Sequence, residues 1–121
     1  SIAAQSLNLN KKARIVYVRK EIGIEFKLSF ERTWSAISRA IDRTNYAVAD
    51  RNRELRYIQL DLEEEDDGFF SFFGSSEADK EVDYELVFTE IGENTLLEFK
   101  KLSDTEVTVN ELVDKINENL S

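Results

Sequence analysis

The sequence predicts an α+β protein in which an antiparallel sheet of four to six strands packs on two helices. Several short segments alternate apolar and polar residues, which is typical of half-buried strands. Two other segments repeat apolar residues at helical spacing, which is typical of amphipathic helices. Because strands joined by hairpins leave one apolar face, both helices are expected to bury their apolar sides against that face.

The N-terminal part of the chain predicts a tail followed by strand structure. Residues 1–12 are polar and irregular, and we expect them to form a flexible tail. Residues 13–18 combine β-branched and aromatic side chains, which is compatible with a short strand. Ile24, Phe26 and Leu28 then alternate with charged residues and predict the first full strand.

Two segments predict helices with defined starting residues. Ser29 is a suitable N-cap for a helix that runs to about Thr44, with an apolar face formed by Phe30, Trp34, Ile37 and Ile41. Thr108 and Glu111 have the spacing of a capping box, and the helix that follows has an apolar face formed by Val109, Leu112, Val113, Ile116 and Leu120. Trp34 is therefore expected in the core.

The segment between the helices predicts two hairpins. The first joins a strand that begins at Tyr46 to a strand at 57–62 through a turn at 51–54. The second joins strands at 82–89 and 95–100 through a turn at 92–94.

In the second hairpin the alternation assigns Asp83 to the polar face together with Glu85. The predicted order is thus strand, helix, four strands, helix, within a single domain over residues 13–121.

The composition excludes several kinds of protein. The chain has no Cys and no His, which excludes Ser-His and Cys-His nucleophile pairs and the common zinc ligand sets. We therefore predict a protein that is not an enzyme and binds no metal ion and no cofactor. No apolar run approaches the roughly 20 residues of a membrane-spanning helix.

The charge is distributed unevenly along the chain. Residues 1–60 carry 12 Lys and Arg against 6 Asp and Glu, a net of +6, and residues 61–121 carry 4 against 19, a net of −15; together they give −9. Nucleic acid is not an expected partner of so acidic a chain.

Five acidic residues at 63–67 run directly into four of the eight phenylalanines: Phe69, Phe70, Phe72 and Phe73. Glycine and serine interrupt any regular period, so residues 63–81 are expected to form a long loop between the hairpins. An EF-hand calcium loop is excluded because its twelfth position would be Gly74. The four Phe either complete the core or contact a partner protein or lipid. We expect Phe70 and Phe73 to point inward and Phe69 and Phe72 outward.

Five arginines are candidates for a patch that binds anions: Arg39, Arg43, Arg51, Arg53 and Arg56. Such a patch would form if the end of the first helix lay beside the first hairpin turn. The alternative is an ordinary solvated rim in which these arginines pair with Asp42, Asp50 and Glu54.

Taken in order, these segments resemble the BamC lipoprotein family. The resemblance covers residues 24–120 and rests on the helix series Phe30, Trp34, Ile37 and Ile41, the strand with Tyr46, Val48, Asp50 and Arg51, the Phe-rich segment, Tyr84 to Leu86 and the closing helix. It implies a helix-grip domain, in which an antiparallel sheet packs on a long C-terminal helix. It also implies a non-enzymatic accessory subunit of the β-barrel assembly machinery, with protein partners in that complex.

The resemblance also implies attachment to the outer membrane through a lipid, on the periplasmic side. The lipidated cysteine of such proteins is absent from this chain, which begins with Ser1 rather than Met. We therefore expect a soluble fragment of a lipid-anchored protein.

Two functions follow from these observations. The first is a protein-interaction module with candidate contact residues Phe69, Phe70, Phe72, Phe73, Arg39 and Arg43. The alternative is a carrier of a small apolar ligand, because a sheet that grips a helix can enclose a cavity. That cavity would be lined by Phe26, Trp34, Tyr84, Phe88 and Phe99.

Overall fold

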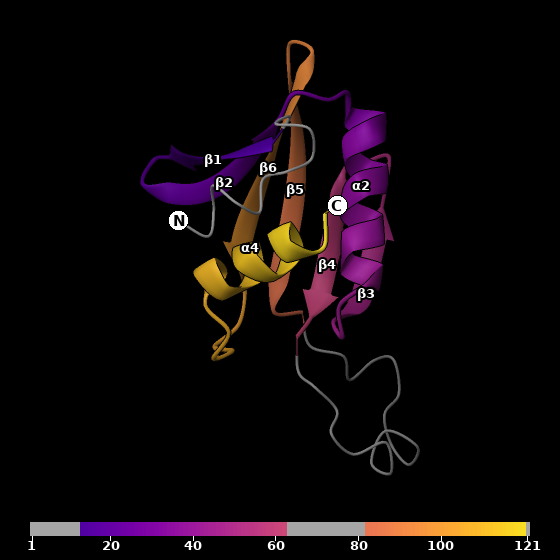
Figure 1. Cartoon of the computed structure of the whole chain (residues 1–121). Coiled ribbons are helices and arrows are strands. Elements are labelled where there is room, and N and C mark those ends of the chain that lie inside the picture. Colours follow the sequence, from indigo (N-terminus) through magenta and orange to yellow (C-terminus); the bar gives the residue numbers. More distant parts are fainter. Residues whose placement is uncertain (1–12, 63–81, 121) are drawn as a thin grey trace.

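The computed structural model describes residues 13–62 and 82–120, in which a six-stranded antiparallel sheet has two helices on one face (Figure 1). The strands lie in the order β1-β2-β6-β5-β4-β3. The predicted α+β class is confirmed, with the number of strands at the upper end of the predicted range.

The elements follow one another along the chain as β1 (Ala13–Val18), β2 (Glu21–Phe26), α2 (Phe30–Asp42), β3 (Ala47–Asn52), β4 (Tyr57–Asp61), β5 (Tyr84–Ile91), β6 (Asn94–Lys101) and α4 (Val109–Glu118). The predicted order had one strand before the first helix, and the structure has two. β1 pairs with β2 along its whole length, from Ala13 opposite Phe26 to Val18 opposite Glu21. The pattern of residues 13–18 is too short to predict a strand by itself, and the strand is stabilised by side-chain pairs with β2.

Both helix N-termini are capped as predicted. The Ser29 hydroxyl accepts a hydrogen bond from the Arg32 backbone N–H at 3.3 Å. The Thr108 hydroxyl accepts from the Glu111 N–H at 3.1 Å, and the Glu111 carboxylate accepts from the Thr108 N–H at 2.9 Å. These bonds satisfy backbone donors that have no partner within the helix.

The core lies between the helices and the sheet. An aromatic cluster of Phe30, Trp34 and Phe88 joins α2 to β5, with the rings of Trp34 and Phe88 5.0 Å apart between centroids. All three residues are buried, which confirms the core position of Trp34. The guanidinium of Arg56, in the turn between β3 and β4, lies 4.3 Å from the centre of the Phe30 ring and covers the cluster on that side.

The N-terminal hairpin joins the rest of the sheet through a short pairing of β2 with β6. This pairing runs only from Gly23 opposite Glu98 to Phe26 opposite Thr95. Gly23 is buried, and a Cβ atom at this position would lie 2.9 Å from the backbone oxygen of Leu97. A larger residue would therefore push the two strands apart at the point where their pairing ends.

We predict that Gly23→Ala lowers the free energy of unfolding by about 1–3 kcal/mol, because the backbone of β6 must move to admit a methyl group. The measurement is equilibrium denaturation in urea. Gly92→Ala is the matched control, since Gly92 has a φ of +64° but no atom within 4 Å of an added Cβ. Its expected loss is only about 1 kcal/mol, from backbone strain. Equal losses in the two variants would contradict the role of the β2–β6 contact.

Candidate functional site

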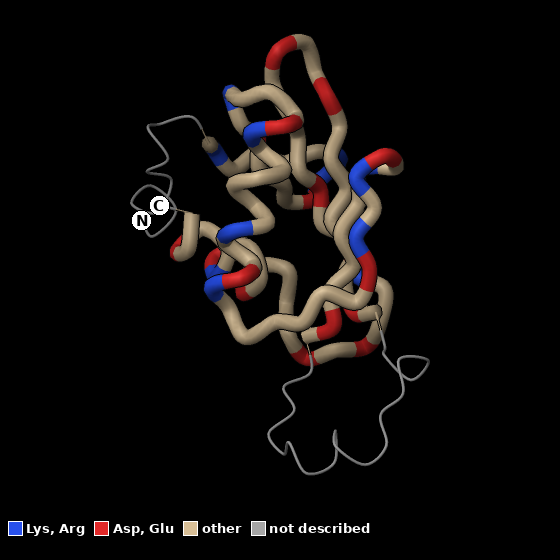
Figure 2. Tube along the Cα trace, turned by 90° about the vertical axis from the view of Figure 1, so that its right-hand side faces the viewer, with Lys and Arg blue, Asp and Glu red and all other residues tan. Residues whose placement is uncertain are grey.

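The acidic and Phe-rich segment lies outside the described residues, and so do Phe69, Phe70, Phe72 and Phe73. Their inward or outward orientation remains a prediction, as does the tail predicted for residues 1–12. The structure does describe the two ends from which residues 63–81 depart, where β4 ends and β5 begins (Figure 1). Figure 2 shows several acidic positions at this end of the molecule.

Asp83 ties these two ends together. Its carboxylate accepts hydrogen bonds from the Leu62 backbone N–H at 2.7 Å and from the Ser103 hydroxyl at 2.5 Å. Its own N–H donates to the Leu60 carbonyl, and its carbonyl accepts from the Leu102 N–H, both at 2.8 Å. Asp83 is only 1% exposed. One buried residue thus joins the end of β4, the start of β5 and the chain that leaves β6.

The same hydrogen-bond network continues toward α4. The Ser103 hydroxyl also accepts from the Thr105 N–H at 3.1 Å, and the Thr105 hydroxyl accepts from the Val107 N–H at 3.3 Å. The Val107 carbonyl accepts from the Tyr84 hydroxyl at 2.8 Å. Hydrogen bonds therefore join the connection before the α4 capping box to Asp83 and Tyr84 at the start of β5.

The assignment of Asp83 to the polar face was wrong. β5 begins only at Tyr84, and Asp83 precedes the alternation rather than taking part in it. A carboxylate is stable in this buried position because charge-assisted hydrogen bonds from donors on two other segments satisfy it. No local pattern in the sequence indicates this role, because the donors, Leu62 and Ser103, lie about 20 positions away on either side.

The five candidate arginines do not form one patch. At the start of α2, Arg53 forms an ion pair with Glu31 and Arg56 with Glu90. Arg43 follows the end of α2, and its guanidinium donates to the Asn119 carbonyl at 2.8 Å. A helix of 13 residues is about 20 Å long, so it separates the two groups.

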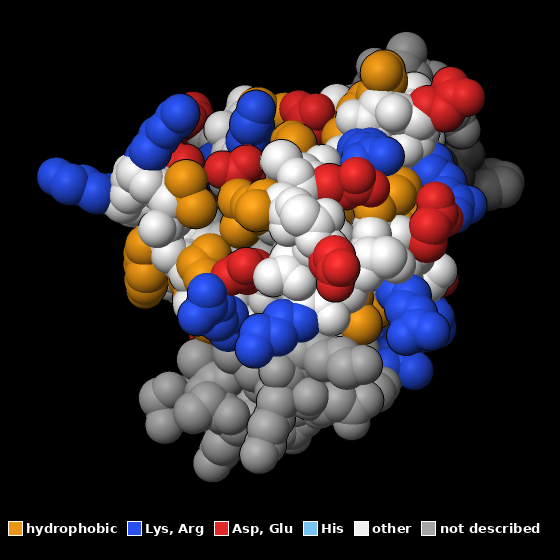
Figure 3. Space-filling view, turned by 90° about the horizontal axis from the view of Figure 1, so that it is seen from above, with side chains coloured by type: hydrophobic (Ala, Val, Ile, Leu, Met, Phe, Trp, Pro, Cys, Tyr) orange, Lys and Arg blue, Asp and Glu red, His pale blue; other side chains and the backbone are white. Residues whose placement is uncertain are grey.

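The end of the molecule that carries the β3–β4 turn has charges of both signs. Seen from above, Lys and Arg side chains alternate there with Asp and Glu (Figure 3). The alternative of a solvated rim describes this end better than an anion-binding patch. Its acidic partners are Glu31 and Glu90, however, rather than those that the sequence suggested.

Arg39 and Arg43 lie toward the end of the molecule from which residues 63–81 depart. Ala47, which follows α2 after a short connection, pairs with Asp61 at the end of β4. The last turn of α2 therefore lies near the same end of the sheet. Arg39 is exposed there, whereas Arg43 links α2 to the end of α4.

Two surface grooves border α4 and carry opposite charges. The first has a volume of about 690 Å³, lies between the β1–β2 hairpin, β6 and the start of α4, and includes three lysines and one acid: Lys20, Lys100, Lys101 and Glu21. We call it the lysine groove. The second, of about 450 Å³, lies between α4 and the ends of α2 and β4 and includes three acids and one lysine: Glu111, Asp114, Glu118 and Lys115. These lysines are far apart in the chain, so no local pattern in the sequence indicates that they lie together.

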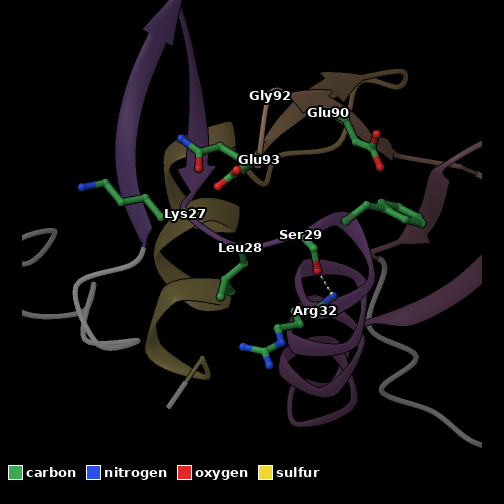
Figure 4. A pocket seen from close by; sticks show the side chains of 9 residues that line it. Lys27, Leu28, Ser29, Arg32, Glu90, Gly92 and Glu93 are labelled. Carbon is green, nitrogen blue, oxygen red and sulfur yellow. Dashed lines mark hydrogen bonds between the residues drawn. The ribbon is translucent and has the colours of Figure 1, made fainter.

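A third hollow, of about 470 Å³, lies between the start of α2 and the β5–β6 turn. Lys27, Arg32, Glu90 and Glu93 are placed around it, with Lys27 next to Glu93 (Figure 4). Its charges are balanced, and the Ser29 hydroxyl already accepts the nearest helix N–H. This hollow therefore has no preference for a positively or a negatively charged ligand.

We predict that Asp83→Ala lowers the free energy of unfolding by about 2–4 kcal/mol, because the variant leaves two hydrogen-bond donors without their acceptor. Equilibrium denaturation measures this loss. Asp104→Ala is the control at an exposed acid nearby, with an expected change within about 0.5 kcal/mol. Similar values for both variants would show that the network of Asp83 does not stabilise the fold.

The raised pKa of Tyr84 predicts that the fold becomes less stable at alkaline pH. Burial raises the pKa of its hydroxyl, and the negative charges of Glu111 and Asp83 raise it further. A tyrosine whose folded pKa exceeds its unfolded value, about 10, stabilises the fold fully below that pH. This stabilisation is lost as the pH rises through the folded pKa.

Tyr84→Phe should therefore lose less stability between about pH 9 and pH 11 than the wild type, as measured by urea denaturation at each pH. Tyr17→Phe, at an exposed tyrosine, is the matched control and should follow the wild-type curve. A Tyr84→Phe curve that also follows the wild type would contradict the assigned role of Tyr84.

Neither of the two helices in the described part of the chain has the length and apolar character of a membrane span.

Comparisons with known proteins place the chain in a family. No curated protein matches the chain. Residues 23–121 match the family described as the outer membrane protein assembly factor BamC-like C-terminal domain. This range includes both helices and every strand from β3 onward, and it begins within β2. The chain therefore belongs to the BamC-like C-terminal domain family.

Proposed function

We propose that this chain is a non-catalytic module that binds protein partners in the assembly of outer-membrane proteins. The family match over residues 23–121 carries this proposal, because the family is described as an outer membrane protein assembly factor. The composition supports it, since the whole chain lacks His and Cys, the side chains that most often act as bases and nucleophiles. The natural site of action is the periplasmic side of the outer membrane, with membrane attachment through a lipid.

The proposed contact surface is the end of the molecule where β4 ends and β5 begins. Phe69, Phe70, Phe72 and Phe73 belong to the segment that departs from this end, and aromatic side chains often dominate the energy of protein interfaces. The Asp83 network supports this choice because it gives the segment a rigid base. Arg39 and Arg43 lie toward the same end and are the proposed charged contacts.

The alternative is a carrier of a small apolar ligand. Of the five aromatic residues expected to line its cavity, Trp34 and Phe88 are in ring contact with each other and with Phe30. All five are buried. No observation on residues 13–62 and 82–120 favours the carrier over the interaction module, so the module is the proposal that we develop.

The test is co-purification of the outer-membrane assembly complex with the full chain. Changing each of Phe69, Phe70, Phe72 and Phe73 to Ser should reduce the recovered complex several-fold for at least one variant, with an unchanged melting temperature. Arg39→Ala should reduce recovery without loss of stability. Arg43→Ala should reduce both, because it also removes the hydrogen bond to Asn119, worth about 1 kcal/mol.

Leu55→Ser is the control, since Leu55 is 69% exposed in the β3–β4 turn, away from the proposed surface. If all four Phe variants retain the complex, the Phe-rich segment is not the contact. If they lose several degrees of melting temperature instead, these side chains belong to the core. Failure of the wild-type chain to recover the complex would contradict the proposed function itself.

A further inference from the structure

The sheet opens on one side of β6. β2 pairs with β6 only as far as Gly23 opposite Glu98, but β6 continues to Lys101. On its other side β6 remains paired with β5 as far as Tyr84 opposite Lys101. Within the described part of the chain, no strand pairs with residues 99–101 on the β2 side. The β1–β2 hairpin diverges from β6 there, as Figure 1 shows.

The backbone groups that face this opening can be assigned from the register. The Leu102 N–H donates to the Asp83 carbonyl, so the backbone groups of Leu102 point toward β5. Because successive residues of a strand direct their N–H and C=O groups to opposite sides, those of Phe99 and Lys101 point toward the opening. A strand edge with such groups is a template for a further strand.

The lysine groove lies along this edge. Its volume of about 690 Å³ is within the range of roughly 300–1,000 Å³ that is usual for binding pockets. Tyr17, which is 71% exposed, and the half-buried Ile22 provide apolar surface in it, whereas Phe99 lies buried behind them.

The charge of the groove is opposite to that of the chain. Lys20, Lys100 and Lys101 line it with Glu21 as the single acid, whereas the chain as a whole has a net charge of −9. None of the three lysines forms an ion pair with another described residue. An acidic segment along this edge therefore meets lysines on both faces of the sheet, because Lys100 and Lys101 are successive residues of β6.

We propose that the lysine groove binds an extended acidic peptide segment of a partner protein, which adds a strand to the free edge of β6. Backbone hydrogen bonds to Phe99 and Lys101 hold the segment, and the lysines select its charge. Side chains of the added strand alternate between the two faces, so apolar side chains contact Tyr17 and Ile22 on the helix face. This rests on the proposed function, for which it specifies the chemistry of one partner.

The test uses the full chain and a fluorescent peptide of about six residues, the usual length of a strand, in which acidic and aromatic residues alternate. Fluorescence anisotropy should show binding that weakens as salt is added. A peptide with lysine in place of the acids should not bind. Lys20→Glu and Lys101→Glu should each weaken binding about tenfold or more. Lys27→Glu is the matched control, with the same change of charge in the hollow at the start of α2, and should bind as the wild type does.

Methylation of the peptide amides tests the strand pairing itself. Two peptides are made, each methylated at every second amide, in complementary positions. Only one of them should lose binding, because alternate amides face β6. Equal binding by both would overturn the added strand, and equal loss with Lys27→Glu would overturn the lysine groove as the site.

The outcome is separable from that of the proposed function. If no acidic peptide binds but the chain still recovers the assembly complex, the lysine groove is not a binding site and the proposed function stands. If the peptide binds but the complex is not recovered, the proposed function fails. The chain could instead self-associate in a way that the peptide does not displace. That result would overturn the proposal, because the edge of β6 would then bind a second copy of the chain rather than a partner segment.

Discussion

The pairing of β2 with β6 joins the N-terminal hairpin to the other four strands, and the single continuous sheet exists only because of it. It joins residues about 70 positions apart in the chain, from Gly23 opposite Glu98 to Phe26 opposite Thr95. Through it the N-terminal hairpin and the second hairpin become one sheet, and the apolar face becomes wide enough for both helices. Gly23 permits the close approach of the strands. Because the pairing is short, the same contact that completes the sheet also leaves part of β6 without a neighbour.

The one-sided sheet explains where charge gathers. Both helices bury their apolar sides against the same face, and α4 lies across it with a groove of opposite charge at each border. Exposed groups around α4 therefore come from segments that are distant in sequence: lysines from β6 and from the turn after β1, and acids from α4 itself. In a chain of net charge −9, such separation gives one local surface a sign opposite to that of the whole.

The Asp83 network connects the fold to the family assignment. A domain that acts by binding proteins needs rigid positions from which to present contact residues. Asp83 supplies one by joining β4, β5 and the connection to α4 with buried hydrogen bonds. Leu62 and Asp83, close to the two points where residues 63–81 join the described chain, are thus linked by a hydrogen bond. The match to an outer-membrane assembly family covers residues 23–121 and therefore includes this network.

The α+β class, the β3–β4 and β5–β6 hairpins, the two helices and their caps could all be predicted from the sequence. These features depend on local periods and on neighbours within four positions, such as Thr108 and Glu111, which a linear pattern contains. The burial of Asp83, the separation of Arg43 from Arg56 by the length of α2, and the lysine groove could not be predicted from the sequence and became evident only in the folded chain. Each of these depends on which distant segments become neighbours, and that follows from strand pairing and packing summed over the whole core rather than from any local pattern.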